Sequence, residues 1–255
     1  MSSDRWPGTS WYADEAGPDR TGSEPLTGNE SVDLAVIGGG LAGMTTALSS
    51  LEKGIDRVAL IEADHVGAGA SGRNGGFVFS GYSLSNDSLA DQLGDEGARR
   101  LHGWTRQSVQ RIRKRIDDYQ LDCQANGAGV VLTDWFHDSP TLKAFADRMH
   151  RRLGFELTWL DPDECAAHVD SKRYGAGLHE PGSFHFHPLR HIRELARCFI
   201  ERGGKVWSQT RIRSIERDGG DWVLRSEQGQ VRAKEVVLTT GGYDLRLRRR
   251  LQKAL

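Results

Sequence analysis

Two glycine-rich segments in tandem constrain the fold of this 255-residue chain more than any other feature. The first is an apolar run at residues 34–37, typical of a strand buried in a parallel sheet, followed by a G-x-G-x-x-G pattern at residues 38–43. Gly38 allows a tight turn from strand to helix, Gly40 lets the backbone approach a pyrophosphate, and Gly43 lets the helix pack closely on the strand. We therefore expect a dinucleotide at the helix N-terminus, where free N–H groups and a partial positive charge face the phosphates.

An acidic residue strengthens this prediction. A second apolar run at residues 57–61 ends in Glu62, whose carboxylate can accept hydrogen bonds from an adenosine ribose. Strand, glycine motif, helix, second strand and terminal acid occur in order within about thirty residues. An ordinary βαβ unit would need the glycines for its tight turn but not the acid, so dinucleotide binding is the stronger hypothesis.

The second glycine-rich segment covers residues 67–76 and predicts a long, glycine-lined loop. Such a loop can carry the second half of a dinucleotide, and the pair of segments indicates FAD. A later apolar strand begins at Glu235 and runs through Thr240 into Gly241 and Gly242, and this Gly-Gly ending lets the backbone approach the cofactor again at the carboxyl edge of the sheet. A plain turn would need the same glycines, so this last signal is weaker.

The composition excludes several classes of function. The chain has 34 basic and 35 acidic residues, which gives no general case for nucleic-acid binding. Its three cysteines show no C-x-x-C spacing, so neither a zinc site nor a redox pair is indicated, and their low number fits a reducing compartment. No apolar stretch approaches the length of a membrane span, and the N-terminus lacks the apolar core of a signal peptide. We expect a cytoplasmic protein with no metal, no nucleic-acid partner and no membrane span.

The pattern along the chain predicts an arm and two interleaved domains. Residues 1–30 are polar and rich in Gly and Pro, so we expect a disordered arm that docks occasionally; its aromatic residues could also pin it to the domain surface or reach a ligand entrance. Residues 31–85 and 186–255 are expected to form the FAD-binding domain. The pattern at residues 86–185 indicates short strands and helices that do not repeat the βαβ order. It predicts an inserted α+β substrate region. A helix is expected at 95–119 and carries a basic cluster at residues 111–115. We interpret this cluster as a solvated helix face rather than an anion-binding site.

Two histidines precede a predicted helix that begins at Pro188. His185 and His187 alternate with two phenylalanines, so both imidazoles face one way in an extended chain. Metal binding would need a third ligand, and the pattern indicates none. Turn geometry and hydrogen bonds to the neighbouring backbone are favoured, and a role near a flavin stays open.

Together these motifs resemble the superfamily of FAD-dependent amine and amino-acid oxidases, the D-amino-acid oxidase-like proteins. Within it, the chain is most similar to the branch resembling gamma-glutamylputrescine oxidase. The resemblance covers essentially the whole chain and is carried by these segments: residues 10–12, 25–26, 38–43 with Glu62, 69–76, 187–190 and 237–243.

The resemblance implies an α/β fold: a doubly wound, Rossmann-like FAD-binding domain with an interleaved α+β substrate domain. It places residues 71–76 along the pyrophosphate, ribityl and isoalloxazine portions of FAD, and a backbone contact to adenine at Ile212. Arg73 could bias the flavin electronics or pair with a phosphate or a carboxylate. The full set of expected cofactor contacts is Gly38, Gly40, Leu41, Ala42, Gly43, Glu62, Ala63, Ser71, Arg73, Asn74, Gly75, Gly76, Ile212, Thr240 and Gly241.

The resemblance also implies a chemistry. A C–H bond next to an amine nitrogen delivers hydride to the flavin, the imine hydrolyses to a carbonyl compound, and oxygen takes the electrons to give hydrogen peroxide. A primary or secondary amine, or an amino acid, is the expected substrate. The alternatives are a dehydrogenase that passes electrons to a quinone or carrier, and a non-catalytic flavoprotein remnant. Because family members are usually longer, we expect a C-terminally truncated chain, and no catalytic residue is assigned.

Overall fold

The structure is a computed structural model that describes residues 10–19, 21, 23–171 and 173–242. Its chain divides into two compact units, and each is described by itself. Unit 1 contains residues 1–75, 121–123 and 187–255, and unit 2 contains residues 76–120 and 124–186. Trp6 and Tyr243, which belong to segments singled out in the sequence, lie outside the described residues.

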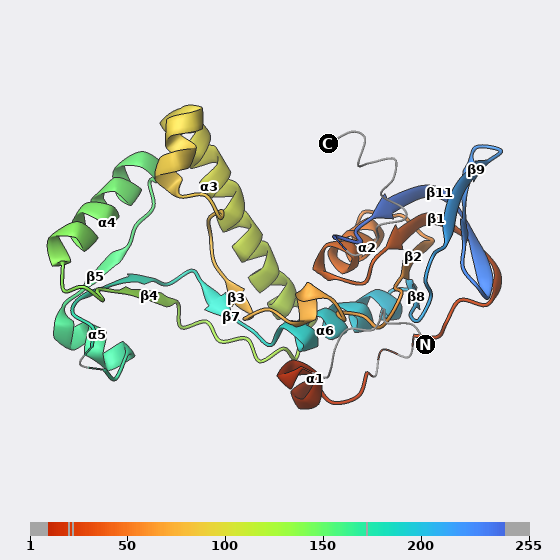
Figure 1. Ribbon diagram of the computed structural model, residues 1–255, viewed down its shortest axis with the longest axis horizontal. Helices are drawn as coiled ribbons and strands as arrows, with labels where there is room; N and C mark the ends of the chain where they lie inside the picture. Colours follow the sequence, from red (N-terminus) through yellow and green to blue (C-terminus); the bar gives the residue numbers. More distant parts are fainter. Residues whose placement is uncertain (1–9, 20, 22, 172, 243–255) are drawn as a thin grey trace. The chain divides into compact units, whose positions relative to one another are not determined.

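Unit 1 is built on a six-stranded sheet with the order β8-β2-β1-β11-β10-β9 (Figure 1). The first four of these strands are parallel, and β10 and β9 are antiparallel to their neighbours. The bounds are β1 Gly28–Ile37, β2 Val58–Ile61, β8 Lys205–Trp207, β9 Ser214–Asp218, β10 Asp221–Arg225 and β11 Gly229–Leu238. Every side chain of β2 is buried, as expected for a central parallel strand.

Two strand predictions differ from the structure. The sequence pattern predicts a strand at 211–215, but the strand begins later, at Ser214, because its pairing with β10 starts at that residue. The pattern also predicts two strands, at 230–232 and from 235 onward, whereas β11 is one continuous strand because it pairs with β1 along almost its whole length.

The helices of unit 1 are α1 Trp11–Ala16, α2 Leu41–Glu52 and α6 Pro188–Glu201. The apolar stripe predicted for α6 is buried, with Leu189, Ile192, Leu195, Ala196 and Phe199 all at most 2% exposed. This helix packs on α2, on β8 and on the short 3-10 helix η1 at Ala70–Gly72. α1 also packs on α6, so this part of the N-terminal arm is a docked helix rather than the disordered segment expected from its composition.

Unit 2 contains three helices and two small sheets among its described residues. Its helices are α3 Asn86–Tyr119, α4 Ser139–Leu153 and α5 Pro162–His168. One antiparallel sheet has the order β4-β6-β5, formed by Val130–Thr133, Gly177–Glu180 and Thr158–Leu160, and the other pairs β3 Phe77–Val78 with β7 Phe184–His185. α3 begins nine residues before the predicted start at 95, and non-helical backbone at Gly94 (φ 73°) divides it there.

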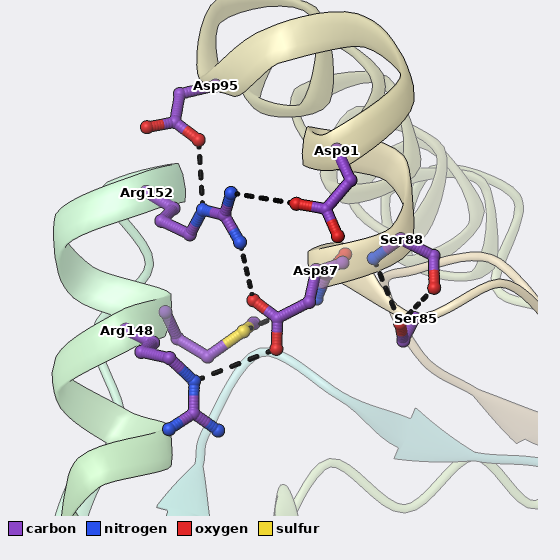
Figure 2. Close-up of polar contacts among 9 residues, drawn as sticks. Ser85, Asp87, Ser88, Asp91, Asp95, Arg148 and Arg152 are labelled. Carbon is purple, nitrogen blue, oxygen red and sulfur yellow. Dashed lines mark hydrogen bonds and ion pairs between the residues drawn. The ribbon is translucent and has the colours of Figure 1, made fainter.

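A charged clamp joins α3 to α4 in unit 2 (Figure 2). The guanidinium of Arg152 on α4 donates to Asp95 at 2.9 Å, to Asp87 at 2.8 Å and to Asp91 at 3.4 Å, all three on α3. Arg148, one turn earlier on α4, lies 3.6 Å from Asp87. Beside these ion pairs the two helices bury a shared apolar cluster: Leu89, Ala90, Ala98, Met149, Leu153 and Phe155.

Candidate cofactor site

The turn from β1 to α2 lies at the point where the strand order of the sheet reverses. From β1 the chain continues to β2 and then β8 on one side, while β11 pairs with the other side of β1. Ligands of open α/β sheets bind at such a reversal, outside the carboxyl ends of the strands. The predicted glycine motif at 38–43 begins directly after β1, and Thr239 directly follows β11.

Close backbone packing explains why glycine occupies two positions of this turn. Gly38 has a φ of 114°, and a Cβ there would lie 2.8 Å from the carbonyl oxygen of Thr239. A Cβ at Gly43 would lie 1.9 Å from the carbonyl oxygen of Gly38. Thr239 fixes this arrangement, because its hydroxyl is 2.9 Å from the Ile37 oxygen and 3.1 Å from the Gly38 oxygen. Sequence reasoning missed Thr239; its place directly before the expected contact Thr240 was the available signal.

The N-terminus of α2 presents backbone amides beside the second glycine-rich loop. Gly40 is the N-cap residue and has no side chain with which to bond these amides. Ser71 supplies a partner instead, since its hydroxyl accepts a hydrogen bond from the Leu41 N–H at 2.9 Å. The first intrahelical bond follows at Met44, whose N–H donates to Gly40. Leu41 and Ala42 are exposed, so this helix end is open to an anion.

Glu62 links the two loops that follow β1 and β2. One carboxylate oxygen accepts the Gly39 N–H at 2.6 Å, and the other accepts the Asp64 N–H at 2.8 Å. The backbone of Glu62 is held by β8 and the segment after it, through Trp207 and Thr210. Each carboxylate oxygen keeps a second lone pair that could accept a ribose hydroxyl. Ala63, the next residue, is exposed.

The second glycine-rich loop folds back against the first. The Gly67 N–H donates to the Gly39 carbonyl at 2.9 Å. A Cβ at Gly72 would lie 2.2 Å from the Gly67 carbonyl, so only glycine fits there without a shift. Arg73 donates from Nε to the Ala68 carbonyl at 2.9 Å. The side-chain amide of Asn74 donates to the carbonyls of Ala70 and Ser71 at 3.2 and 2.9 Å, which closes the loop on itself.

The remaining expected contacts lie in different parts of the chain. Gly75 is the last residue of the first segment of unit 1, and Gly76 belongs to unit 2. Ile212 is 6% exposed and lies in the apolar core beneath the sheet. Thr240 and Gly241 follow β11 at the same sheet edge as Gly38.

The two histidines of the 184–187 segment have different surroundings. His187 is the N-cap of α6, and its Nδ1 accepts the Arg190 N–H at 3.1 Å. This bond is of the kind favoured from the sequence. His185 lies exposed in β7. Over the described ranges, no group of three His, Cys, Asp or Glu side chains is arranged to hold a metal ion.

The chemistry of these groups matches the parts of FAD. An open helix N-terminus suits a pyrophosphate, and a carboxylate with free lone pairs suits a ribose diol. The glycines at 38, 43 and 72 let the strand, the helix and the two loops pack closely beside this helix end. In the part of the chain that the structure describes, no helix is both long and apolar enough to cross a membrane.

The chain is similar to known oxidoreductases. The family described as DAO, FAD dependent oxidoreductase, matches residues 33–255. Gamma-glutamylputrescine oxidoreductase of Escherichia coli K12 is 33% identical over 217 residues, which are 84% of this chain and 50% of that protein. The probable oxidoreductase OrdL of Haemophilus influenzae is 29% identical over 86% of this chain and 51% of its own length.

The fold comparison gives the same result. The crystal structure of glycine oxidase from Geobacillus kaustophilus superposes with a TM-score of 0.66 at 21% identity, covering 88% of this chain and 59% of that one. The chain spans about half the length of the curated relatives it matches. On the match across residues 33–255, the chain belongs to the DAO family of FAD-dependent oxidoreductases.

Proposed function

We propose that this chain binds FAD and supplies the cofactor-binding part of an oxidoreductase that acts on a primary or secondary amine or an amino acid. The observation that carries the proposal is the position of Glu62. Its carboxylate joins the Gly39 amide to the loop after β2, beside the open N-terminus of α2. An ordinary βαβ turn has no need of a carboxylate at that position.

The adenosine and pyrophosphate half of FAD would be held by unit 1. Glu62 would accept the ribose hydroxyls, and the backbone of Ala63 and Ile212 would lie along the adenosine. The amides of Gly40, Leu41 and Ala42 would face the pyrophosphate, with the helix dipole favouring its negative charge. Gly38 and Gly43 would keep the helix close enough to the strand for those amides to reach it.

The flavin half would extend along the second loop. Ser71, Arg73, Asn74, Gly75 and Gly76 would follow the pyrophosphate, ribityl chain and isoalloxazine in that order. Thr240 and Gly241 would approach from the end of β11. The region expected at 86–185 would contribute residues that recognise the substrate. The cytoplasmic location expected from the sequence stays a prediction.

FAD, when bound, would supply the two-electron chemistry. The C–H bond next to the amine nitrogen breaks, its electron pair leaves with the hydrogen, and the carbon becomes an imine. Water adds to the imine and releases a carbonyl compound together with ammonia or an amine. Oxygen, as final acceptor, takes the two electrons and two protons to form hydrogen peroxide. The residues of this chain orient the reactants and keep the phosphates neutralised.

A gamma-glutamylated polyamine or a small amino acid is the substrate class we favour. The support is the name and 33% identity of the Escherichia coli relative. A dehydrogenase that passes the same electrons to a quinone or carrier is the second candidate, because the same fold and cofactor site would serve it.

An anaerobic experiment separates these functions. Purified chain with FAD is mixed without oxygen with a panel that contains gamma-glutamylputrescine and small amino acids, and the visible flavin absorbance is followed. Bleaching followed by rapid recovery and peroxide on admitting oxygen supports the oxidase. Bleaching with slow recovery, accelerated by a quinone, supports the dehydrogenase. A flavin that is bound but never bleached contradicts the enzymatic proposal for this chain.

A further inference from the structure

A buried histidine begins helix α6 beneath the docked N-terminal helix. His187 is 4% exposed, and Tyr12 of α1 packs edge-on against its ring with the centroids 5.0 Å apart. Because Nδ1 accepts the Arg190 N–H at 3.1 Å, this nitrogen carries no proton. Nε2 is buried and has no hydrogen-bond partner among the described residues. The site is therefore built for a neutral imidazole.

The first turns of α6 also hold α1 in place. Arg190 donates to the Glu15 carbonyl at 3.2 Å and to its carboxylate at 3.4 Å. Arg193 donates to the Gly17 carbonyl at 2.7 Å, just after the end of α1. α1 is thus fixed by side chains whose positions depend on where α6 begins.

The same helix start packs against the predicted cofactor loop. The Cδ1 atom of Leu189 lies 2.8 Å from the position a Cβ would take at Gly67 and 3.0 Å from that position at Gly72. Gly72 directly follows Ser71, whose hydroxyl accepts a hydrogen bond from the Leu41 N–H of α2. A continuous set of contacts within unit 1 therefore runs from α1 through the start of α6 to the loop beside the α2 N-terminus.

We propose that His187 is a positioning residue for the cofactor loop: its neutral ring orders the first turn of α6 and the docked α1, and thereby holds residues 67–72 in the shape that binds FAD. This inference rests on the proposed function, because it needs FAD at that loop. Protonation of His187 would place a hydrogen on Nδ1 facing the Arg190 N–H, which breaks the N-cap bond.

The charges around the ring set the direction of the pH effect. Burial lowers the pKa of His187, the nearby Arg190 and Arg193 lower it further, and Glu15 opposes them. With a pKa depressed in the folded state, the stabilisation is complete above the ordinary value of about 6.5 and is lost as the pH falls through the lower folded value. The charged groups that act on the ring are Arg190, Arg193 and Glu15, and Tyr12 packs against it. Two further groups lie one step away: His191 donates its backbone N–H to the His187 carbonyl, and Asp122 lies 3.8 Å from Arg190.

The test measures FAD affinity of the full chain, by quenching of flavin fluorescence, at pH 7.5 and at pH 5.5. We expect the dissociation constant of the unmodified chain to rise on acidification, towards the roughly fivefold change that complete loss of an N-cap implies. His187→Asn caps a helix but does not titrate, so it should bind well at both pH values. His187→Ala should bind weakly at both. His185→Asn, the matched control two residues away, should keep the original pH dependence.

The Asn variant also excludes another source of the pH effect. His65 lies in the loop after Glu62, where its Nδ1 is 2.8 Å from an Asp64 carboxylate oxygen. Because His187→Asn leaves His65 and every other titratable group in place, a pH dependence that persists in this variant would come from a group other than His187 and would overturn the inference.

Hydrogen exchange gives a readout that does not need FAD. At pH 7.5, the amides of the first turn of α6 should exchange about fivefold faster in His187→Ala than in the unmodified chain or in His187→Asn. Equal protection in all three would overturn the inference. If the chain binds no FAD at any pH, the proposed function is overturned as well. If the chain binds FAD but His187→Asn keeps the original pH dependence, only the role of His187 is overturned.

Discussion

Replacing Gly43 by alanine tests the steric account of the β1–α2 turn. The new Cβ would lie 1.9 Å from the Gly38 carbonyl oxygen, about 1 Å closer than real Cβ atoms approach any neighbour. It would also lie 2.6 Å from the Thr239 hydroxyl, which is hydrogen-bonded to that same carbonyl. The helix must therefore move away from the strand and break this bond. Overpacking of this kind costs about 1–3 kcal/mol, against about 1 kcal/mol gained from the better helix propensity of alanine.

A second glycine provides the matched control for this substitution. Gly103 is also helical, in α3 of unit 2, but a Cβ there would meet nothing within 4 Å. Gly103→Ala should therefore stabilise the protein by up to about 1 kcal/mol and leave FAD affinity unchanged. Gly43→Ala should weaken FAD binding by about tenfold or more, as the amides of α2 move away from the phosphates. The assays are urea denaturation and titration with FAD. Equal effects of the two substitutions would refute the steric reasoning.

Three further predictions concern other charged or titratable groups. Glu62→Gln should weaken FAD binding by about tenfold or more, since a hydrogen bond to a charged group contributes about 1.5–3 kcal/mol; a titration at pH 7.5 that shows unchanged affinity would rule out the ribose role. Arg152→Ala should lower the melting temperature more than Arg148→Ala, because Arg152 pairs with three aspartates and Arg148 with one. Screening by 1 M salt should reduce this difference, which calorimetry at low salt and at 1 M salt checks. His102 is buried against Phe155, and burial lowers its pKa, so the free energy of unfolding should decrease as the pH falls from about 6.5. His102→Leu should not show this decrease. Urea denaturation at pH 7 and pH 5 checks this, and an equal loss of stability in both proteins would contradict it.

Local chemistry explains why parts of the fold could be predicted from the sequence. The β1–α2–β2 order follows from apolar runs, glycines and a terminal acid that act within a few residues of one another. The sequence Asp161-Pro162-Asp163-Glu164 predicts the start of α5, because a capping residue, a proline at the first helical position and acids in the first turn are all local signals; the structure shows a capping box between Asp161 and Glu164. α6 was predicted because its apolar period and Pro188 are both local signals.

The features that were missed depend on residues far apart in the sequence. α1 is ordered by Arg190 and Arg193, more than 170 residues later in the chain. The clamp at Arg152 joins helices whose paired residues are 57 to 65 positions apart. The first part of α3 was missed for the opposite reason, because Gly94 interrupts the helical backbone and hides the continuation from a pattern search.

The most direct test of the central claim is competition at the proposed FAD site. The strongest geometric case is for the adenosine and pyrophosphate half, with Glu62 and the α2 N-terminus side by side. Chain loaded with FAD is titrated with ADP and, separately, with FMN, and release of the flavin is followed by its fluorescence. We expect ADP to displace FAD, and we expect FMN, which lacks the adenosine, to bind far more weakly than FAD. Failure of ADP to compete, or equal affinity for FMN and FAD, would contradict it.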